Sequence, residues 1–177
     1  TVTVKDGAAS VADITMQKSV AVETEKISSE AMDVYVAKNF PSVVRYEMKG
    51  DLAGKTFYGQ TQAIDKVKIN GTEVTISPDN VKAAFAADKA TYVMTMKDEA
   101  NHIDAEVTAE LVVSGDELAF NITKIDNKLQ DQTTTNTYGQ QVETYPIQTI
   151  SIPNHSLISV SAAQAGANMK GAVMSSN

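Results

Sequence analysis

Two histidines are the only imidazole side chains in the protein, and each lies beside groups with which it could do chemistry. His102 precedes Asp104 and Glu106 at alternate positions, which point to one face when the chain is a strand. A histidine and two carboxylates on one face can ligate a divalent cation, although a metal site needs several such groups to converge. The alternative is an exposed acidic strand face, and we favour this interpretation and expect no metal site.

The second histidine, His155, follows Pro153 and Asn154, which are typical of a tight turn. A histidine there can act as a general base, or it can hold a backbone group, and we favour the second role. Tyr138 lies in a polar segment beside Gly139, where its ring is placed to stack on a sugar. Tyr138 and His155 are therefore the two candidate ligand-binding residues.

Motifs for catalysis are missing from the sequence. Many Asp and Glu residues are available for a two-carboxylate glycosidase mechanism, but the sequence does not place any two of them across a cleft. It has neither a glycine-rich phosphate loop nor a nucleophile elbow. We therefore assign no catalytic residue and expect no cofactor.

Composition excludes several classes of partner. The net charge of −7 argues against binding to nucleic acid or insertion into an anionic membrane, and no apolar run is long enough to span a bilayer. Cysteine is absent, which excludes disulfides and thiolate metal sites, and tryptophan is absent too. The first residue is Thr1 rather than Met, so we expect residues 1–177 to form a single domain that is a fragment of a larger multidomain chain.

The stretch from Thr91 to Asp126 is the centre of the expected fold. Apolar residues alternate with polar ones from Ile103 to Val113, and after a turn at Ser114–Glu117 the alternation resumes at Leu118, Phe120 and Ile122. A period of two predicts strands with one apolar face. Such a meander needs a second sheet to cover that face, so the stretch predicts an antiparallel β-sandwich.

Other segments fit the same class. We expect strands over residues 33–37, 43–48, 56–60, 67–69, 72–76, 145–152, 157–160 and the beginning of one more at 170–174, with extended chain before residue 26. Asn70-Gly71 predicts a type I′ hairpin turn. Residues 81–90 are Ala-rich and compatible with a helix capped by Asp79 or Asn80, but their alternation favours a strand paired with residues 92–96. Residues 127–144 are polar and predict a long functional or mobile loop. In all we expect ten to twelve strands and at most a turn or two of helix.

Several of these segments, in the same order along the chain, resemble a known family. They are residues 34–47 (VYVAKNFPSVVRYE), 58–61 (YGQT), 67–71 (VKING), 102–107 (HIDAEV), 122–125 (ITKI), 150–160 (ISIPNHSLISV) and 171–177 (GAVMSSN). Together they resemble the galactose-mutarotase-like β-sandwich domain that precedes the catalytic barrel in bacterial endo-α-N-acetylgalactosaminidases. The resemblance implies an all-β supersandwich, of which residues 1–177 are a part.

The resemblance also carries a functional expectation. Enzymes of this kind are large secreted or surface-attached proteins that release galactosyl-β-1,3-N-acetylgalactosamine from Ser or Thr of mucin-type glycoproteins. Their catalytic carboxylates belong to the barrel, so no position of this chain inherits those roles. True mutarotases use a His and a Glu in the sandwich groove, and neither His102 nor His155 aligns with that pair.

Three functions follow as hypotheses. The first is a non-catalytic accessory sandwich that packs on the catalytic barrel of the same chain, outside the cell, and contacts O-glycan carbohydrate. The second is a stand-alone carbohydrate-binding or adhesin module, against which the absence of tryptophan counts. The third, an aldose epimerase, we rank last. A large exposed apolar patch would favour the first, because a domain separated from its barrel exposes the interface.

Overall fold

The computed structural model describes residues 22–60, 62–129, 133–143 and 145–159. These residues contain strands and two short 3-10 helices, and none of them forms an α-helix. The strands are β1 (Thr24–Ser28), β2 (Met32–Ala37), β3 (Val43–Met48), β4 (Thr56–Tyr58), β5 (Lys66–Ile69), β6 (Thr72–Thr75), β7 (Val81–Phe85), β8 (Lys89–Asp98), β9 (Ile103–Ser114), β10 (Glu117–Asn127), β11 (Thr133–Thr135), β12 (Gln141–Glu143) and β13 (Ile150–Ser151). The 3-10 helices are η1 (Gly50–Leu52) and η2 (Pro78–Asn80).

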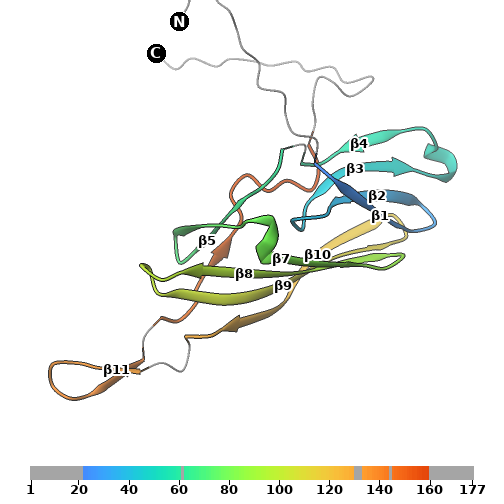
Figure 1. Cartoon of the computed structure of the whole chain (residues 1–177). Coiled ribbons are helices and arrows are strands. Elements are labelled where there is room, and N and C mark those ends of the chain that lie inside the picture. The colour runs from blue at the N-terminus through green and yellow to red at the C-terminus, as the bar shows by residue number, and fades with distance from the viewer. Residues whose placement is uncertain (1–21, 61, 130–132, 144, 160–177) are drawn as a thin grey trace, which may run out of the picture.

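Antiparallel pairing joins the strands into three sheets and one separate hairpin. The largest sheet has the order β10-β9-β8-β7, a second has the order β1-β2-β3-β4, and a third has the order β13-β5-β6. Strands β11 and β12 pair only with each other in the described part of the chain. Figure 1 shows the β1–β4 sheet lying over one end of the large sheet, and β5 over the other end.

The large sheet confirms the central sequence prediction. Along β9, every second residue from Ile103 to Val113 is buried, and along β8 the same holds for Tyr92, Met94 and Met96. Strand β7 pairs with β8, with Val81 opposite Met94, so the strand prediction for this Ala-rich stretch is confirmed. The apolar faces of β8 and β9 therefore form one continuous floor.

Two smaller sheets cover this floor and divide the core in two. At one end, Ala90, Tyr92, Leu111 and Val113 pack against Ile27, Val34, Val36 and Val43 of the β1–β4 sheet. At the other end, Met94, Met96, Val107 and Ala109 pack against Val67, Ile69 and Val74 of the β5–β6 hairpin. The arrangement is the expected sandwich: one long sheet with two short sheets on the same face.

Turn chemistry also agrees with expectation. Asn70 and Gly71 have φ values of 49° and 84°, which is the pair of positive angles that a type I′ hairpin turn requires. Gly59 is different, because its φ is unexceptional but its backbone lies against two other segments. A Cβ at this position would overlap the carbonyl oxygen of Val43 and come within 2.8 Å of the carbonyl oxygen of Leu157.

Three expectations about the C-terminal part were wrong within the described residues. The strand expected over residues 145–152 is reduced to β13, and that over 157–160 is reduced to a single bridge between Ser159 and Tyr58. The polar stretch 127–144 is not a plain loop, because β11 and β12 form a hairpin within it. Thirteen strands are described, against the ten to twelve expected. The segments expected at residues 1–21 and 170–174 lie outside the described residues.

Candidate functional site

Tyr138 lies in the turn of the β11–β12 hairpin, which projects away from the sheets (Figure 1). Its side chain is 87% exposed. The turn is held by Asn136, whose Oδ1 accepts hydrogen bonds from the backbone N–H groups of Tyr138 and Gln140. An exposed aromatic ring on an ordered turn suits ligand contact, and the role of Tyr138 stays a prediction.

His155 lies in the expected turn after β13, and its ring is half-buried between Phe40 and Phe120. Its Nε2 lies 3.1 Å from the carbonyl oxygen of Pro41; since a carbonyl only accepts, this nitrogen carries the proton and donates it. Burial lowers the pKa of His155, so the imidazole is neutral at pH 7. The ring thus holds a backbone group, as favoured from the sequence, and its part in ligand binding stays a prediction.

The structure places His102 differently from the prediction made from the sequence. It does not share a strand face with Asp104 and Glu106, because β9 begins at Ile103 and His102 belongs to the preceding turn with a φ of 53°. Its ring stacks on Tyr145, with centroids 4.2 Å apart and planes inclined by 15°. Among the described residues, no three histidine, aspartate or glutamate side chains are grouped closely enough to hold a metal ion. Sequence reasoning missed the His102–Tyr145 pair, whose members are 43 positions apart in the sequence.

The segment that carries Tyr145 is fixed by two asparagines. Asn127 donates from Nδ2 to the carbonyl oxygen of Tyr145 at 2.9 Å. Asn70 donates to the carbonyl oxygen of Pro146, and its Oδ1 accepts from the backbone N–H groups of Gln148 and Thr149. The backbone from Tyr145 to Thr149 is therefore held mainly by side chains, together with one backbone hydrogen bond from the Asn70 N–H to the carbonyl oxygen of Thr149 at 2.9 Å. This holds Tyr145 in place although its φ is 79°, an unusual angle for an aromatic residue.

The stacked pair forms part of the wall of a small pocket. The pocket has a volume of about 90 Å³ and lies between the β8–β9 turn, the β5–β6 turn and the segment after β12. Its polar lining includes Asn70, Asn101, Asp104 and Asn127. We call it the His102–Tyr145 pocket.

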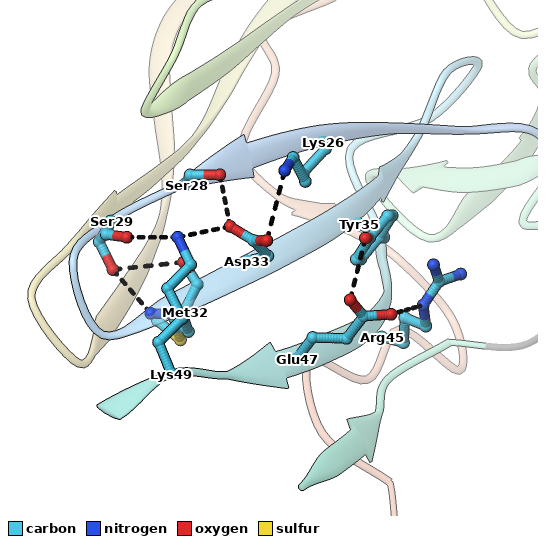
Figure 2. Close-up of polar contacts among 9 residues, drawn as sticks. All are labelled: Lys26, Ser28, Ser29, Met32, Asp33, Tyr35, Arg45, Glu47 and Lys49. Atoms are coloured by element: carbon cyan, nitrogen blue, oxygen red, sulfur yellow. Dashed lines mark hydrogen bonds and ion pairs between the residues drawn. The ribbon is translucent and has the colours of Figure 1, made fainter. Parts of the chain in front are cut away.

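On the outer face of the β1–β4 sheet, Asp33 is the centre of a polar network (Figure 2). Its carboxylate is 2.6 Å from Lys49 Nζ and 3.3 Å from Lys26 Nζ, and it accepts a 2.6 Å hydrogen bond from Ser28 Oγ. The Lys49 hydrogen bond, helped by those of Ser28 and Lys26, lowers the Asp33 pKa to about 2. Because both carboxylate oxygens already have hydrogen-bond or ion-pair partners, we interpret this cluster as a network that stabilises the fold.

Beside it, Tyr35, Arg45 and Glu47 form a closed triad (Figure 2). Glu47 accepts hydrogen bonds from Arg45 Nε at 2.9 Å and from the Tyr35 hydroxyl at 3.0 Å. The Arg45 guanidinium carbon lies 3.6 Å from the centre of the Tyr35 ring, which adds a cation–π contact. Each side chain of the triad makes a polar or cation–π contact with the other two, as expected for a cross-strand cluster on a solvated sheet face.

A larger apolar groove opens at the other end of the sandwich. It has a volume of about 310 Å³ and is lined mainly by Met32, Met48, Phe57, Leu118, Leu157 and Ile158. Ile158 is 64% exposed. Tyr46 also lines the groove, but its hydroxyl already donates a hydrogen bond to the carbonyl oxygen of Leu157 at 2.8 Å. Asp116 supplies the one charged side chain.

Strand β9 connects the two hollows. It begins at Ile103, which lines the His102–Tyr145 pocket, and it ends at Ser114. Asp116, in the β9–β10 turn that follows, lines the apolar groove. A strand of twelve residues spans about 40 Å. The polar pocket and the apolar groove thus lie at opposite ends of the large sheet.

Neither histidine has a carboxylate hydrogen-bond partner in the described part of the chain, since His155 is bonded to Pro41 and His102 is stacked on Tyr145. No helix within the described ranges has the length and apolar content needed to cross a membrane. Fold and site together define an antiparallel sandwich domain with one polar and one apolar hollow.

Comparison with protein families shows which family of sandwich domains the chain belongs to. Residues 27–177 match the galactose mutarotase-like fold domain. The match covers most of the 177 residues, and the chain belongs to this family.

Proposed function

We propose that this chain is a non-catalytic accessory β-sandwich domain of a secreted or cell-surface endo-α-N-acetylgalactosaminidase. The parent enzyme would release galactosyl-β-1,3-N-acetylgalactosamine from Ser- or Thr-linked mucin-type glycans, with the chemistry in a catalytic barrel of the same chain. Membership of the galactose mutarotase-like family supports the sandwich part of the proposal. The segments from residue 34 to residue 177 that resemble the enzyme's own sandwich domain support the parent.

The observation that carries the accessory role is the apolar groove. Six apolar side chains line it, and its one hydroxyl is already bonded to Leu157. A glycan needs hydrogen-bond partners for its hydroxyls, and here it would find little besides Asp116. A protein surface with apolar side chains fills such a groove favourably, because exposed apolar area is removed from water. We assign the catalytic barrel of the same chain as this partner.

The test uses the full-length parent protein. Ile158→Asp and Leu118→Asp place a charge in the groove, and Leu52→Asp is the matched control for Ile158→Asp, because both of these residues are exposed and Leu52 does not line the groove. We expect the two groove variants to lower the unfolding temperature of the barrel and expose the junction to limited proteolysis, with Leu52→Asp unchanged. Equal behaviour of all three variants would contradict the docking role. The parent assignment fails separately if the unmodified protein does not release the disaccharide from its p-nitrophenyl α-glycoside.

The second candidate function is a stand-alone carbohydrate-binding or adhesin module. The exposed ring of Tyr138 and the His102–Tyr145 pocket favour it. A heteronuclear NMR titration of the chain with the disaccharide attached to threonine separates the two candidates. The binding module would be favoured by two results together: amide shifts that saturate with added disaccharide, and groove variants that leave the unfolding temperature and proteolysis of the parent protein unchanged.

A further inference from the structure

We propose that Asn70 is a deamidation site whose reactivity is controlled by the fold. Asn70-Gly71 is the one Asn-Gly pair in the sequence. When residues 145–149 detach from the β5–β6 turn, the carboxamide of Asn70 becomes free to react with the backbone of Gly71, and the isoaspartate product hinders the segment from docking again. The inference goes beyond the docking role, because Asn70 lies at the other end of the large sheet from the apolar groove.

Asparagine followed by glycine can cyclise without a catalyst. The Gly71 N–H loses its proton to a base in the solvent, and the nitrogen attacks Cγ of Asn70. A C–N bond forms, the Cγ–Nδ2 bond breaks, and Nδ2 takes up a proton from water and leaves as ammonia. Water then opens the resulting succinimide to aspartate or, mainly, to isoaspartate. Glycine favours the attack because it has no side chain to hinder it, so the reaction needs only water.

Burial does not protect this pair of residues. Asn70 and Gly71 are both exposed, and the space around Gly71 is open where a Cβ would stand. Water therefore has access to the turn. Protection of Asn70 in the folded chain has to come from its conformation and its hydrogen bonds.

The carboxamide of Asn70 is held by the 145–149 segment. Its Nδ2 donates to the carbonyl oxygen of Pro146 at 2.8 Å, and its Oδ1 accepts from the N–H groups of Gln148 and Thr149 at 2.8 and 3.1 Å. Cyclisation requires Cγ to come within bonding distance of the Gly71 nitrogen and Nδ2 to leave. These movements are incompatible with the three hydrogen bonds, so the reactive geometry is available only while the segment is detached.

The product does not restore the original contacts. Isoaspartate inserts an extra carbon into the backbone of the turn, which has only two residues between the paired Ile69 and Thr72. Aspartate and isoaspartate both replace the Nδ2 donor by a carboxylate oxygen, which cannot donate to the carbonyl oxygen of Pro146. Conversion of Asn70 is therefore a one-way record that the segment has detached.

The first experiment uses the unmodified full chain. The chain is incubated at mildly alkaline pH in urea concentrations below the unfolding transition, and conversion of Asn70 is followed by peptide mass spectrometry. Hydrogen exchange is measured in parallel at the amides of Gln148 and Thr149, because both donate to Asn70. We expect conversion to rise with this exchange, and to be roughly tenfold or more slower in the folded chain than in the fully unfolded chain. Equal rates in the folded and unfolded chains, or conversion that follows only the exchange of buried Met94, would overturn the proposal.

A variant tests the part played by the segment. Ile147 packs against the core beside β5 and β6, so Ile147→Asp should detach the segment and leave the turn residues unaltered. Ile158→Asp is the matched control, because it is the same substitution at an exposed position in the apolar groove. We expect Asn70 to convert roughly tenfold faster in Ile147→Asp and at the unmodified rate in Ile158→Asp. A dispersed NMR spectrum establishes that Ile147→Asp is folded; without one, the urea series decides. An unmodified rate in folded Ile147→Asp would refute the proposal, because the turn alone would then protect Asn70.

Discussion

The phenolic oxygen of Tyr92 donates a 2.7 Å hydrogen bond to the carbonyl oxygen of Ala37. The bond crosses the core from β8 in the large sheet to the end of β2 in the covering sheet. Tyr92 is fully buried, and burial raises the pKa of its phenol, which therefore stays protonated as a donor.

Removing that hydroxyl should destabilise the fold. Tyr92→Phe leaves the buried carbonyl group of Ala37 without a partner, which costs about 1–3 kcal/mol. We expect the midpoint of urea unfolding to fall with an unchanged slope. Tyr58→Phe is the control, because the tyrosine hydroxyls that donate hydrogen bonds within the described residues are those of Tyr35, Tyr46 and Tyr92. Equal stability of the two variants would show that the cross-sheet bond contributes nothing.

The Asp33 network predicts a dependence on pH. Lys49, Ser28 and Lys26 hold the Asp33 pKa at about 2, below its ordinary value of 3.8. A lowered pKa stabilises the fold above the unfolded value, and this contribution disappears as the pH falls from about 4 towards 2. Asp33→Asn should cost roughly 1 kcal/mol at pH 7, after allowance for solvent screening, and less at pH 3. Urea unfolding at both pH values measures the difference in free energy of unfolding between Asp33→Asn and the unmodified chain, and Asp79→Asn, at an exposed position, is the control. A difference that is not smaller at pH 3 than at pH 7 would contradict a stabilising role for the Asp33 network.

The apolar groove should bind a hydrophobic dye. We expect the isolated chain to enhance the fluorescence of anilinonaphthalene sulfonate, because the dye can occupy the exposed apolar surface. Ile158→Ser should reduce that signal while changing stability by less than about 0.5 kcal/mol, since Ile158 is largely exposed. The matched variant Leu52→Ser lies outside the groove and should keep the signal. A loss of signal in both variants would mean that the dye does not report on the groove.

Asn70 should control the order of the segment after β12. Asn70→Gly keeps the positive φ of the hairpin turn but removes the side chain that binds Pro146, Gln148 and Thr149. We expect faster amide hydrogen exchange at Gln148 and Thr149 and a loss of about 1–2 kcal/mol of stability. Asn70→Asp keeps the acceptor oxygen, so it should largely preserve the protection of both amides. Unchanged exchange in Asn70→Gly would show that the segment is held by other contacts.

Local patterns were enough to predict the sandwich. The alternation from Ile103 to Val113 reports directly on which side chains are buried, because the period of a strand is two. Asn70-Gly71 specified its turn through backbone preference alone. These features depend on neighbours in the sequence, and so the sequence reveals them.

The residues around the pocket depend on distant partners, and here prediction failed. Residues 145–149 have the composition of a strand, but Asn70 and Asn127 bind backbone groups that a neighbouring strand would otherwise bind. His102 was placed on the strand because it continues the alternation. A signal for the turn was present in Asp98, whose carboxylate accepts from the Asn101 backbone N–H, a usual turn contact. No sequence pattern indicated that Tyr145 would stack on His102.

The close packing at Gly59 restricts how sequences of this family can diverge. Several other glycines have a positive φ and open space around them, so asparagine could replace them over evolution at small cost. Gly59 has no such replacement, because any side chain would collide with the backbone of Val43 and Leu157, which are more than one hundred residues apart. We therefore expect glycine at this position in every relative that keeps the 157–159 segment against β4. A relative with another residue there would have to route that segment, and with it one wall of the apolar groove, along a different path.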